Sequence, residues 1–359
     1  MRSECMKIAF FGSSLVSAYW NGAATYYRGI IRELDLRGHR VTFYEPDAYG
    51  RQQHRDIPDP AWARVVVYEA SRPGVDSALE EAGQADLIVK ASGVGVFDEY
   101  LESAVLEKAP ASVIFWDVDA PATLDRIGRN RNDPFRLLIP RYDLILTYGG
   151  GEPVAGAYRQ YGARDCVPVY NALDSTTHYP VPASSRFAAD LGFLGNRLPD
   201  REKRVEEFLF RAAERCPGRS FLLGGSGWEE PSLPANVRLL GHVYTDEHNE
   251  FNSSVGAVLN ISRESMACYG YCPATRVFEA AGAGSCIISD WWEGMEIFLD
   301  PGREVITVRG GDEVAEALER LTPGGAKRIG EAARRRVLAQ HTYRHRAEQL
   351  EMLFNGGIR

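Results

Sequence analysis

The sequence predicts an α/β protein made of two doubly wound, parallel-sheet domains. Three observations support this class. The chain has 359 residues, more than one hydrophobic core usually serves. Short apolar runs alternate with helix-like segments through the first half, and the same alternation begins again in the second half. A proline-containing segment, 167–186, separates the halves. We therefore expect domains at 1–180 and 181–340, with a terminal helix, 341–359, packing back on the first domain.

The first half begins with the strand-like run Ile8–Phe11, which ends at Gly12-Ser13-Ser14. Residues 23–37 have the spacing of an amphipathic helix, with Ile30 and Leu34 on its apolar face. Tyr26 and Tyr27 fall inside this pattern, which favours packing over ligand contact. Further buried strands are predicted at 41–44, 87–89, 113–116 and 144–147.

The second half repeats this pattern. Strands are predicted at 191–194, 220–223, 237–240 and 257–261, a charged helix at 200–215, and one long terminal helix at 326–354. Between them, residues 275–281 read as a short helix with one acid, Glu279, followed by Gly282 and Gly284 and a buried strand at 286–289. A helix start beside a sheet edge suits a diphosphate, and the carboxylate suits sugar hydroxyls. An ordinary helix-to-strand turn is the alternative.

Composition excludes several classes of function. Net charge is −8 and the sequence pI is about 5.5, so a nucleic acid is not the expected partner. The six cysteines are scattered, and the pair Cys268 and Cys272 has no second pair nearby, so we expect a reducing cytoplasm and no metal site. The first strand starts so early that we expect no secretory leader, and no apolar run is long enough for a membrane span.

Neither domain has a dinucleotide or P-loop fingerprint. Gly12-Ser13-Ser14 and Gly93-Val94-Gly95 do not complete a Gly-x-Gly-x-x-Gly motif, which argues against hydride transfer and P-loop chemistry. Ligands of parallel sheets bind at the carboxyl ends of the strands. The expected site therefore lies in a cleft between the two domains.

Several segments resemble one family of enzymes. They are Asn171-Ala172-Leu173-Asp174 with His178-Tyr179-Pro180, Gly192–Arg197, Thr275–Ala281 with the glycines that follow, and His341–Ala347. With these segments the chain resembles a GT-B glycosyltransferase of the CgeB-like family of spore maturation proteins, related to family-4-type transferases. The resemblance implies two Rossmann-like domains facing across a cleft and a nucleotide-diphosphate sugar as co-substrate. One departure is Tyr271, where many retaining members have a second glutamate; inversion and retention therefore both stay open.

The resemblance implies a donor site in the second domain. Arg197, with Thr275 and Arg276 at the helix start, would contact the diphosphate, and Glu279 would accept hydrogen bonds from the ribose. Arg197 could instead be a solvated loop residue, and Arg276 could pair with Glu279. The remaining donor-site candidates follow strands: Gly195, Asn196, Gly224, Gly225, His242, Val243, Ser262 and Arg263.

The candidate base lies in the first domain. Asp119 would take the acceptor proton in an inverting reaction, with Asp117 as the second choice. Either acid could instead cap the next helix, and a retaining reaction needs no base because the leaving diphosphate can receive the proton. Acceptor-side candidates are Gly12, Ser13, Ser14 and Tyr148.

We therefore expect a metal-independent, cytoplasmic glycosyltransferase that uses no cofactor beyond its nucleotide-sugar donor and acts on a small-molecule or glycan acceptor. Two alternatives stay open: a sugar-nucleotide 2-epimerase of the same fold, and a non-catalytic sugar-nucleotide-binding module. The epimerase would need several acids and histidines gathered at the site. The sequence leaves the oligomeric state open.

Overall fold

A computed structural model describes residues 5–19, 21–108, 112–229 and 232–356. The chain divides into two compact units, residues 1–170 with 343–359 and residues 171–342. This division falls ten residues before the boundary expected at 180. The helix at the end of the chain groups with the first unit.

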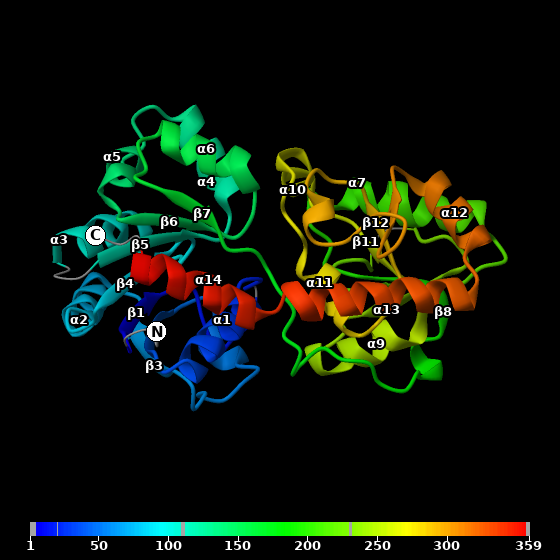
Figure 1. The fold of residues 1–359 in the computed structure, drawn as a ribbon, viewed down its shortest axis with the longest axis horizontal. Helices are drawn as coiled ribbons and strands as arrows, with labels where there is room; N and C mark the ends of the chain where they lie inside the picture. Colours follow the sequence, from blue (N-terminus) through cyan, green and yellow to red (C-terminus); the bar gives the residue numbers. More distant parts are fainter. Residues whose placement is uncertain (1–4, 20, 109–111, 230–231, 357–359) are drawn as a thin grey trace. The chain divides into compact units, whose positions relative to one another are not determined.

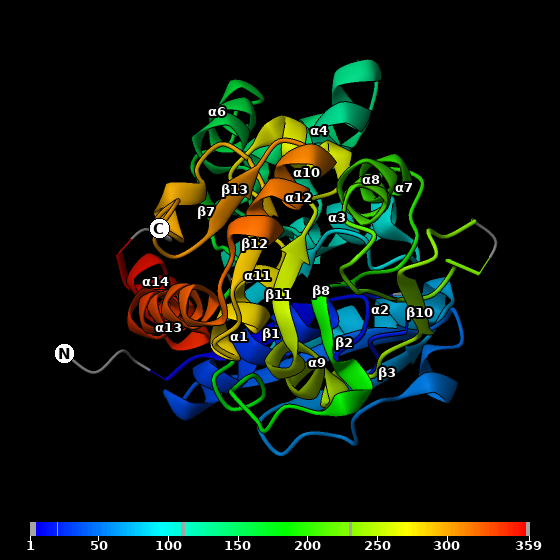
Figure 2. The same cartoon turned by 90° about the vertical axis from the view of Figure 1, so that its right-hand side faces the viewer.

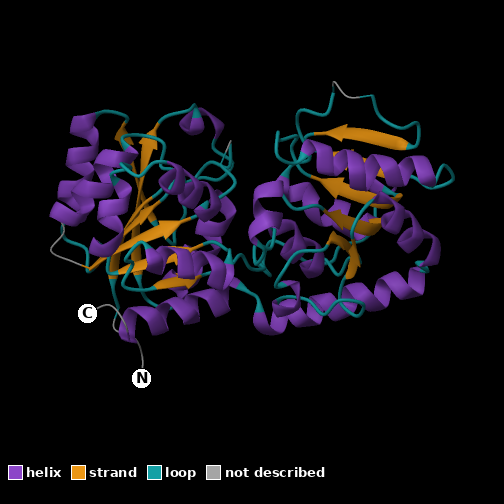
Figure 3. Ribbon diagram, turned by 90° about the horizontal axis from the view of Figure 1, so that it is seen from above, coloured by secondary structure: helices purple, strands orange, loops and turns teal. Residues whose placement is uncertain are grey.

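Unit 1 is a seven-stranded parallel sheet with helices on both faces (Figures 1 and 3). Its strands, in spatial order β3-β2-β1-β4-β5-β6-β7, are β1 (Lys7–Phe11), β2 (Arg40–Asp47), β3 (Arg64–Glu69), β4 (Leu87–Ala91), β5 (Ser112–Asp117), β6 (Leu144–Thr147) and β7 (Cys166–Pro168). Its helices are α1 (Ala24–Leu36), α2 (Arg72–Ala82), α3 (Asp98–Lys108), α4 (Ala120–Arg129), α5 (Phe135–Leu138), α6 (Gly151–Gln160) and α14 (Tyr343–Gly356).

Unit 2 is a six-stranded parallel sheet in which β8 and β11 are the central neighbours (Figure 2). Its strands, in spatial order β10-β9-β8-β11-β12-β13, are β8 (Ala189–Leu194), β9 (Phe221–Gly224), β10 (Val237–Gly241), β11 (Val255–Asn260), β12 (Ile287–Asp290) and β13 (Ile306–Val308). Its helices are α7 (Glu202–Val205), α8 (Arg211–Arg215), α9 (His248–Ser254), α10 (Glu264–Tyr269), α11 (Thr275–Gly282), α12 (Gly311–Arg320) and α13 (Pro323–Gln340).

Apolar side chains explain why each sheet is covered on both faces. The core of unit 1 has an aromatic centre in which Phe10 stacks on Phe43 and meets Tyr27 edge-on. Tyr26 is also buried, and its hydroxyl donates to the Val169 carbonyl at 2.5 Å. Both tyrosines of α1 are thus packing residues, as their helical spacing predicted.

Two predicted helices are wrong in detail. The single helix expected at 326–354 is two helices, because the chain leaves unit 2 between them. At this point the backbone carbonyl of His341 accepts a hydrogen bond at 2.8 Å from the backbone N–H of Leu173. Leu173 lies just after residue 170, where the chain first passes from unit 1 to unit 2. The helix expected at 200–215 begins at Glu202 and contains a π-helical segment, Glu206–Phe210, between α7 and α8.

Helix α14 packs on α1 within unit 1. Arg37 at the end of α1 donates to Glu348 and Glu351, each at 2.6 Å. The ring of Tyr343 lies against Gly29, where any side chain would overlap it. In the described part of the chain, no helix has the length and apolar character needed to cross a membrane.

Candidate functional site

The loops that follow β8 and β9 are interlocked through their backbones. The N–H of Gly195 donates to the Gly224 carbonyl at 2.9 Å, and the N–H of Arg197 donates to Ser226 at 2.9 Å. Gly225 has φ +124°, and a Cβ at this position would overlap the Gly195 carbonyl. Only glycine fits there, because other residues would meet both steric overlap and backbone strain. The two predicted glycine loops therefore form one rigid unit at the carboxyl edge of the sheet.

Arg276 ties the first turn of α11 to these loops. Its Nε donates to the Leu194 carbonyl at 2.7 Å, and its Nη1 donates to Asn260 Oδ1 at 2.9 Å. The guanidinium also lies over the ring of Phe193, 4.6 Å from its centre. The guanidinium hydrogen bonds of Arg276 thus go to Leu194 and Asn260, while its charge still acts on Glu279.

A second guanidinium converges on the same place. A Cβ on Gly195 would lie 2.9 Å from Arg276 Nη2 and 3.0 Å from Arg201 Nη1, so both cations flank this glycine. Burial, followed by repulsion from Arg201, lowers the pKa of Arg276 to about 9. Burial, followed by repulsion from Arg263, lowers the pKa of Arg201 to about 10. An anion bound here would offset the repulsion between these charges.

Three other predicted donor residues have protein partners. Arg197 donates to Glu202 at 2.6 Å, and Arg263 donates to Asp200 at 2.8 Å. Ser262 is buried, and its backbone N–H donates to Asp290 at 2.9 Å. Arg197 is therefore a partly exposed loop residue whose guanidinium is paired with Glu202.

A buried polar network at the ends of β11 and β12 holds the side chain that accepts the Arg276 hydrogen bond. Asn260, at the end of β11, donates from Nδ2 to Ser289 Oγ at 2.9 Å while its Oδ1 holds Arg276. Asp290, at the end of β12, accepts from Arg204 at 2.7 Å. Burial raises the pKa of Asp290, and the hydrogen bonds from Ser262 and Arg204 oppose this rise. This network was not predicted from the sequence, although its signal was present as polar residues at the ends of two apolar strands.

Glu279 lies between two histidines that come from other elements. His178 Nε2 is 3.8 Å from one carboxylate oxygen, and His248 Nδ1 is 3.7 Å from the other. His178 belongs to the segment before β8, His248 begins α9, and Glu279 is in α11. Among the described residues, these three form the group of His, Cys, Asp or Glu side chains close enough to hold a metal ion. The prediction of no metal site rests on the pair Cys268 and Cys272, which has no second pair or closely spaced histidines nearby in the sequence, and so does not concern these three residues.

The charges around Glu279 keep its carboxylate ionised. Burial would raise its pKa, but His178, His248 and Arg276 outweigh burial and lower it to about 2. Burial would lower the pKa of His248, but Glu279 and the Val243 backbone reverse this, so the pKa lies above its usual value. His248 thus interacts both with Glu279 and with the backbone of Val243, which lies in the loop after β10.

This arrangement predicts a stability maximum in weak acid. The lowered pKa of Glu279 contributes stability above about pH 4.5, which is lost as pH falls toward about 2. The raised pKa of His248 contributes stability below about pH 6.5, which is lost as pH rises through the folded-state value. Urea unfolding of wild type from pH 4 to 9 should follow this profile. In Glu279→Gln the decline above pH 6.5 should be much smaller; an unchanged decline would contradict the pairing.

In unit 1, Asp117 and Asp119 have different environments. Asp117 is fully buried and accepts hydrogen bonds from Ser92 Oγ at 2.8 Å, the Asp119 backbone N–H at 3.0 Å and the Tyr158 hydroxyl. Asp119 is exposed at the N-cap position of α4, where its side chain makes no capping hydrogen bond. A buried acid with three donors is poorly placed to accept a substrate proton. Asp117 instead shapes the turn that carries Asp119.

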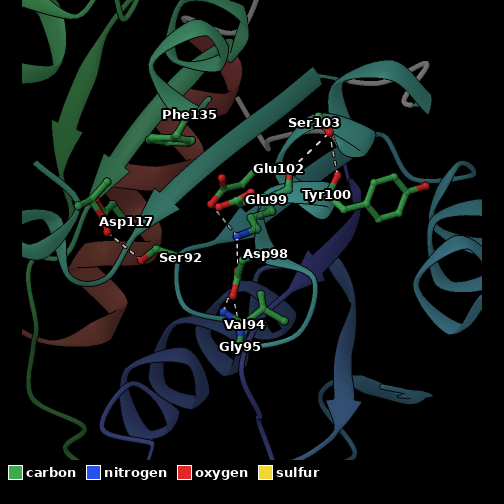
Figure 4. A network of polar contacts seen from close by, with 12 residues as sticks. Ser92, Val94, Gly95, Asp98, Glu99, Tyr100, Glu102, Ser103, Asp117 and Phe135 are labelled. Atoms are coloured by element: carbon green, nitrogen blue, oxygen red, sulfur yellow. Dashed lines mark hydrogen bonds and ion pairs between the residues drawn. The ribbon is translucent and has the colours of Figure 1, made fainter. Parts of the chain in front are cut away.

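Hydrogen bonds join the loop after β4 to the turn after β5 that carries Asp119 (Figure 4). Ser92 bridges Asp117 and the N–H of Val118, while Asp98 accepts from the N–H of Gly95 at 2.6 Å. The fully buried Lys90 donates to Asp98 at 2.6 Å and lies 3.4 Å from Glu102. This buried ion cluster was not predicted from the sequence. Together with the Ser92 contacts, it holds the loops after β4 and β5 in fixed positions.

The acceptor-side candidates are mostly engaged in the fold. Ser13 Oγ donates to Asn21 at 2.8 Å, and Ser14 Oγ donates to Glu45 at 2.9 Å. Both serines are buried, and a Cβ on Gly12 would overlap the ring of Phe43. Tyr148 is half-buried and packs edge-on against Tyr26, 4.9 Å between ring centres. Direct acceptor contact by the two serine hydroxyls is therefore not favoured.

Comparison with known proteins gives one family model and several solved structures. A model described as "Glycosyl transferase-like" matches residues 201–352, which is less than half of the chain. No curated protein sequence matches significantly.

The solved structures match over nearly the whole chain. Sucrose-phosphate synthase of Thermosynechococcus elongatus has a TM-score of 0.71 and 15% identity, with 97% of this chain and 98% of that one covered. The chain has the GT-B fold. HepE of Anabaena in complex with UDP-glucose has a TM-score of 0.67 and 14% identity, covering 98% and 99%. An alpha-glucosyltransferase in complex with UDP-glucose and DNA has a TM-score of 0.71 and 15% identity, covering 98% and 100%.

Within this GT-B fold, all predicted donor residues fall in unit 2 and both candidate bases fall in unit 1. The structure brings Gly195, Asn196, Gly225 and Arg276 together, and it links Val243 to Glu279 through His248. Arg201 is not among the predicted site residues, because the run 200–215 has the pattern of an ordinary charged helix.

Proposed function

We propose that the chain is a glycosyltransferase that moves a sugar from a nucleoside-diphosphate sugar to an acceptor. Unit 2 would bind the donor, and Asp119 of unit 1 would act as the base in an inverting reaction. The predicted cleft between the domains and the relation to CgeB-like proteins stay predictions. A reducing, cytoplasmic compartment is also proposed, on the ground that the six cysteines form no disulfide.

One observation carries this proposal: two partly buried guanidinium groups converge on a glycine loop at the carboxyl edge of a parallel sheet. Arg201 and Arg276 both reach Gly195, and the pKa of each is lowered by burial and by a neighbouring cation. A diphosphate presents several anionic oxygens, and the planar guanidinium fits phosphate geometry in a way that an ammonium does not. Glu279 would then accept hydrogen bonds from the ribose and Val243 would face the base.

The donor assignment rests further on the resemblance in fold. Two of the structures of similar fold were solved with UDP-glucose, so UDP-glucose is the first donor to test. We propose that no metal takes part, because two arginines can supply the positive charge that the leaving diphosphate needs. Turnover should then survive removal of divalent ions by a chelator.

A ligand screen and a turnover assay together test the proposal. UDP and UDP-glucose should stabilise the protein against heat, by roughly 2.7 kcal/mol at a concentration of one hundred times the dissociation constant. Slow release of glucose from UDP-glucose, without added acceptor, should accompany this binding. If none of UDP, ADP, GDP or their sugars stabilises the protein, the proposal fails.

The same measurements separate the alternatives. A non-catalytic module would bind the donor without releasing sugar, and a 2-epimerase would convert UDP-N-acetylglucosamine without releasing its sugar. Among the described residues of the donor unit, the group of acids and histidines found close together has one acid and two histidines, which gives the epimerase little support. DNA as acceptor is disfavoured by the net charge of −8, and binding to duplex DNA that weakens steeply with salt would reverse that view.

A further inference from the structure

The group around Glu279 has an unusual spacing for an ion pair. Each carboxylate oxygen faces a different imidazole nitrogen, at 3.8 Å for His178 and 3.7 Å for His248. Both gaps are longer than a hydrogen bond. His178 Nε2 is buried, with the side chain 7% exposed, and has no hydrogen-bond partner among the described residues. A buried polar nitrogen without a hydrogen-bond partner is costly, and a hydroxyl lying beside the pair, within hydrogen-bond distance of both the imidazole nitrogen and the carboxylate oxygen, would satisfy it.

We infer that His178 and His248 are positioning residues that hold the Glu279 carboxylate toward the ribose diol of the nucleotide donor. The inference rests on the proposed function and extends it to two residues outside the donor-site prediction. A ribose supplies hydroxyls that both donate and accept hydrogen bonds. It can therefore donate to the carboxylate and pair with a neighbouring imidazole nitrogen.

The surroundings favour a ribose over a metal ion at this place. Arg276, one turn before Glu279, exerts its charge on both Glu279 and His248. A divalent cation close to the three side chains would be repelled by this arginine, whereas a neutral diol would not. The Val243 backbone also interacts with His248 and raises its pKa. The proposed ribose contact therefore lies beside Val243, the residue proposed to face the base.

The test compares UDP with 2′-deoxy-UDP by calorimetry. A hydrogen bond to a charged group predicts that wild type binds UDP roughly ten- to a hundredfold more tightly than its deoxy form. His178→Phe, His248→Phe and Glu279→Gln should each reduce this preference to less than about threefold, with little change for 2′-deoxy-UDP.

Conservative variants separate positioning from simple support of the fold. A glutamine amide can occupy the place of His178 Nε2, and an asparagine amide can occupy that of His248 Nδ1. His178→Gln and His248→Asn should therefore keep most of the preference for UDP. His345→Asn, in α14 of unit 1, serves as the histidine control and should leave the preference unchanged.

Each other outcome overturns the inference. Wild type that binds UDP and 2′-deoxy-UDP equally would end it while leaving the proposed function intact. Wild type that binds neither would end both. Loss of UDP preference in both the phenylalanine and the conservative variants would overturn the inference, because it would assign the two histidines a purely structural role. Tight binding of Zn²⁺ alone by wild type, lost in the His178→Phe and His248→Phe variants and unaffected by UDP, would assign the three residues to a metal centre.

Discussion

Asp119→Asn is expected to slow sugar transfer by a factor of about 10²–10⁴ while leaving UDP affinity unchanged, if the reaction inverts. Asparagine cannot take the acceptor proton, and the Asp119 side chain makes no capping hydrogen bond that the change could remove, so α4 should be undisturbed. The measurement is steady-state transfer or hydrolysis of UDP-glucose alongside calorimetric UDP binding. Transfer by the variant within about threefold of wild type would show that Asp119 is not the base.

Asp117→Asn is the matched comparison for this experiment. Asp117 is buried and accepts three hydrogen bonds, so its replacement should act on the fold. We expect it to lower the free energy of unfolding by about 1–3 kcal/mol, because an amide cannot accept from all three donors. A selective loss of turnover in Asp117→Asn, with stability intact, would exchange the roles of the two acids.

The second large effect is expected from Arg276→Ala, which should weaken UDP binding by about 2–5 kcal/mol. Arg276 is held by Leu194 and Asn260 with its Nη2 toward Gly195, so truncation removes one of the two cations beside this glycine, where the diphosphate is proposed to bind. Arg201→Ala should weaken UDP in the same direction. UDP affinities from calorimetry, with uridine as the ligand that lacks phosphates, measure this directly.

The control for the arginine series is Arg211→Ala. Arg211 is exposed in the same unit and pairs with Asp312, away from the glycine loops. Its loss should leave UDP affinity within twofold. If Arg276→Ala weakens uridine as strongly as UDP, the arginine supports the shape of the site and does not bind the diphosphate.

The sequence predicted the central strands well, because buried parallel strands are continuous apolar runs. It missed β3, β7 and β13, which are all edge strands. Two of them, β7 and β13, have only three residues, too few for a pattern. The break between α13 and α14 was missed because the helical pattern continues through His341, whereas the break arises from a contact with Leu173, far away in the sequence.

The candidate site was predictable only where one short segment carries it. Glycine loops and the Arg276–Glu279 helix start are local features, and the sequence selected them. His178, His248 and Glu279 lie 70 and 31 residues apart, and only the order of strands in the sheet brings them together. Arg201 likewise becomes notable only through its distance from Arg276. Such juxtapositions depend on topology, which residue spacing does not contain.

The path of the chain has a consequence for biosynthesis. Unit 2 is one continuous segment, 171–342, but unit 1 needs residues 343–356 to cover α1. A nascent chain can therefore complete its second unit before its first. Until the last helix leaves the ribosome, the face of α1 around Gly29 stays uncovered. Truncation near residue 342 would thus harm the amino-terminal sheet more than the unit at whose end the cut is made.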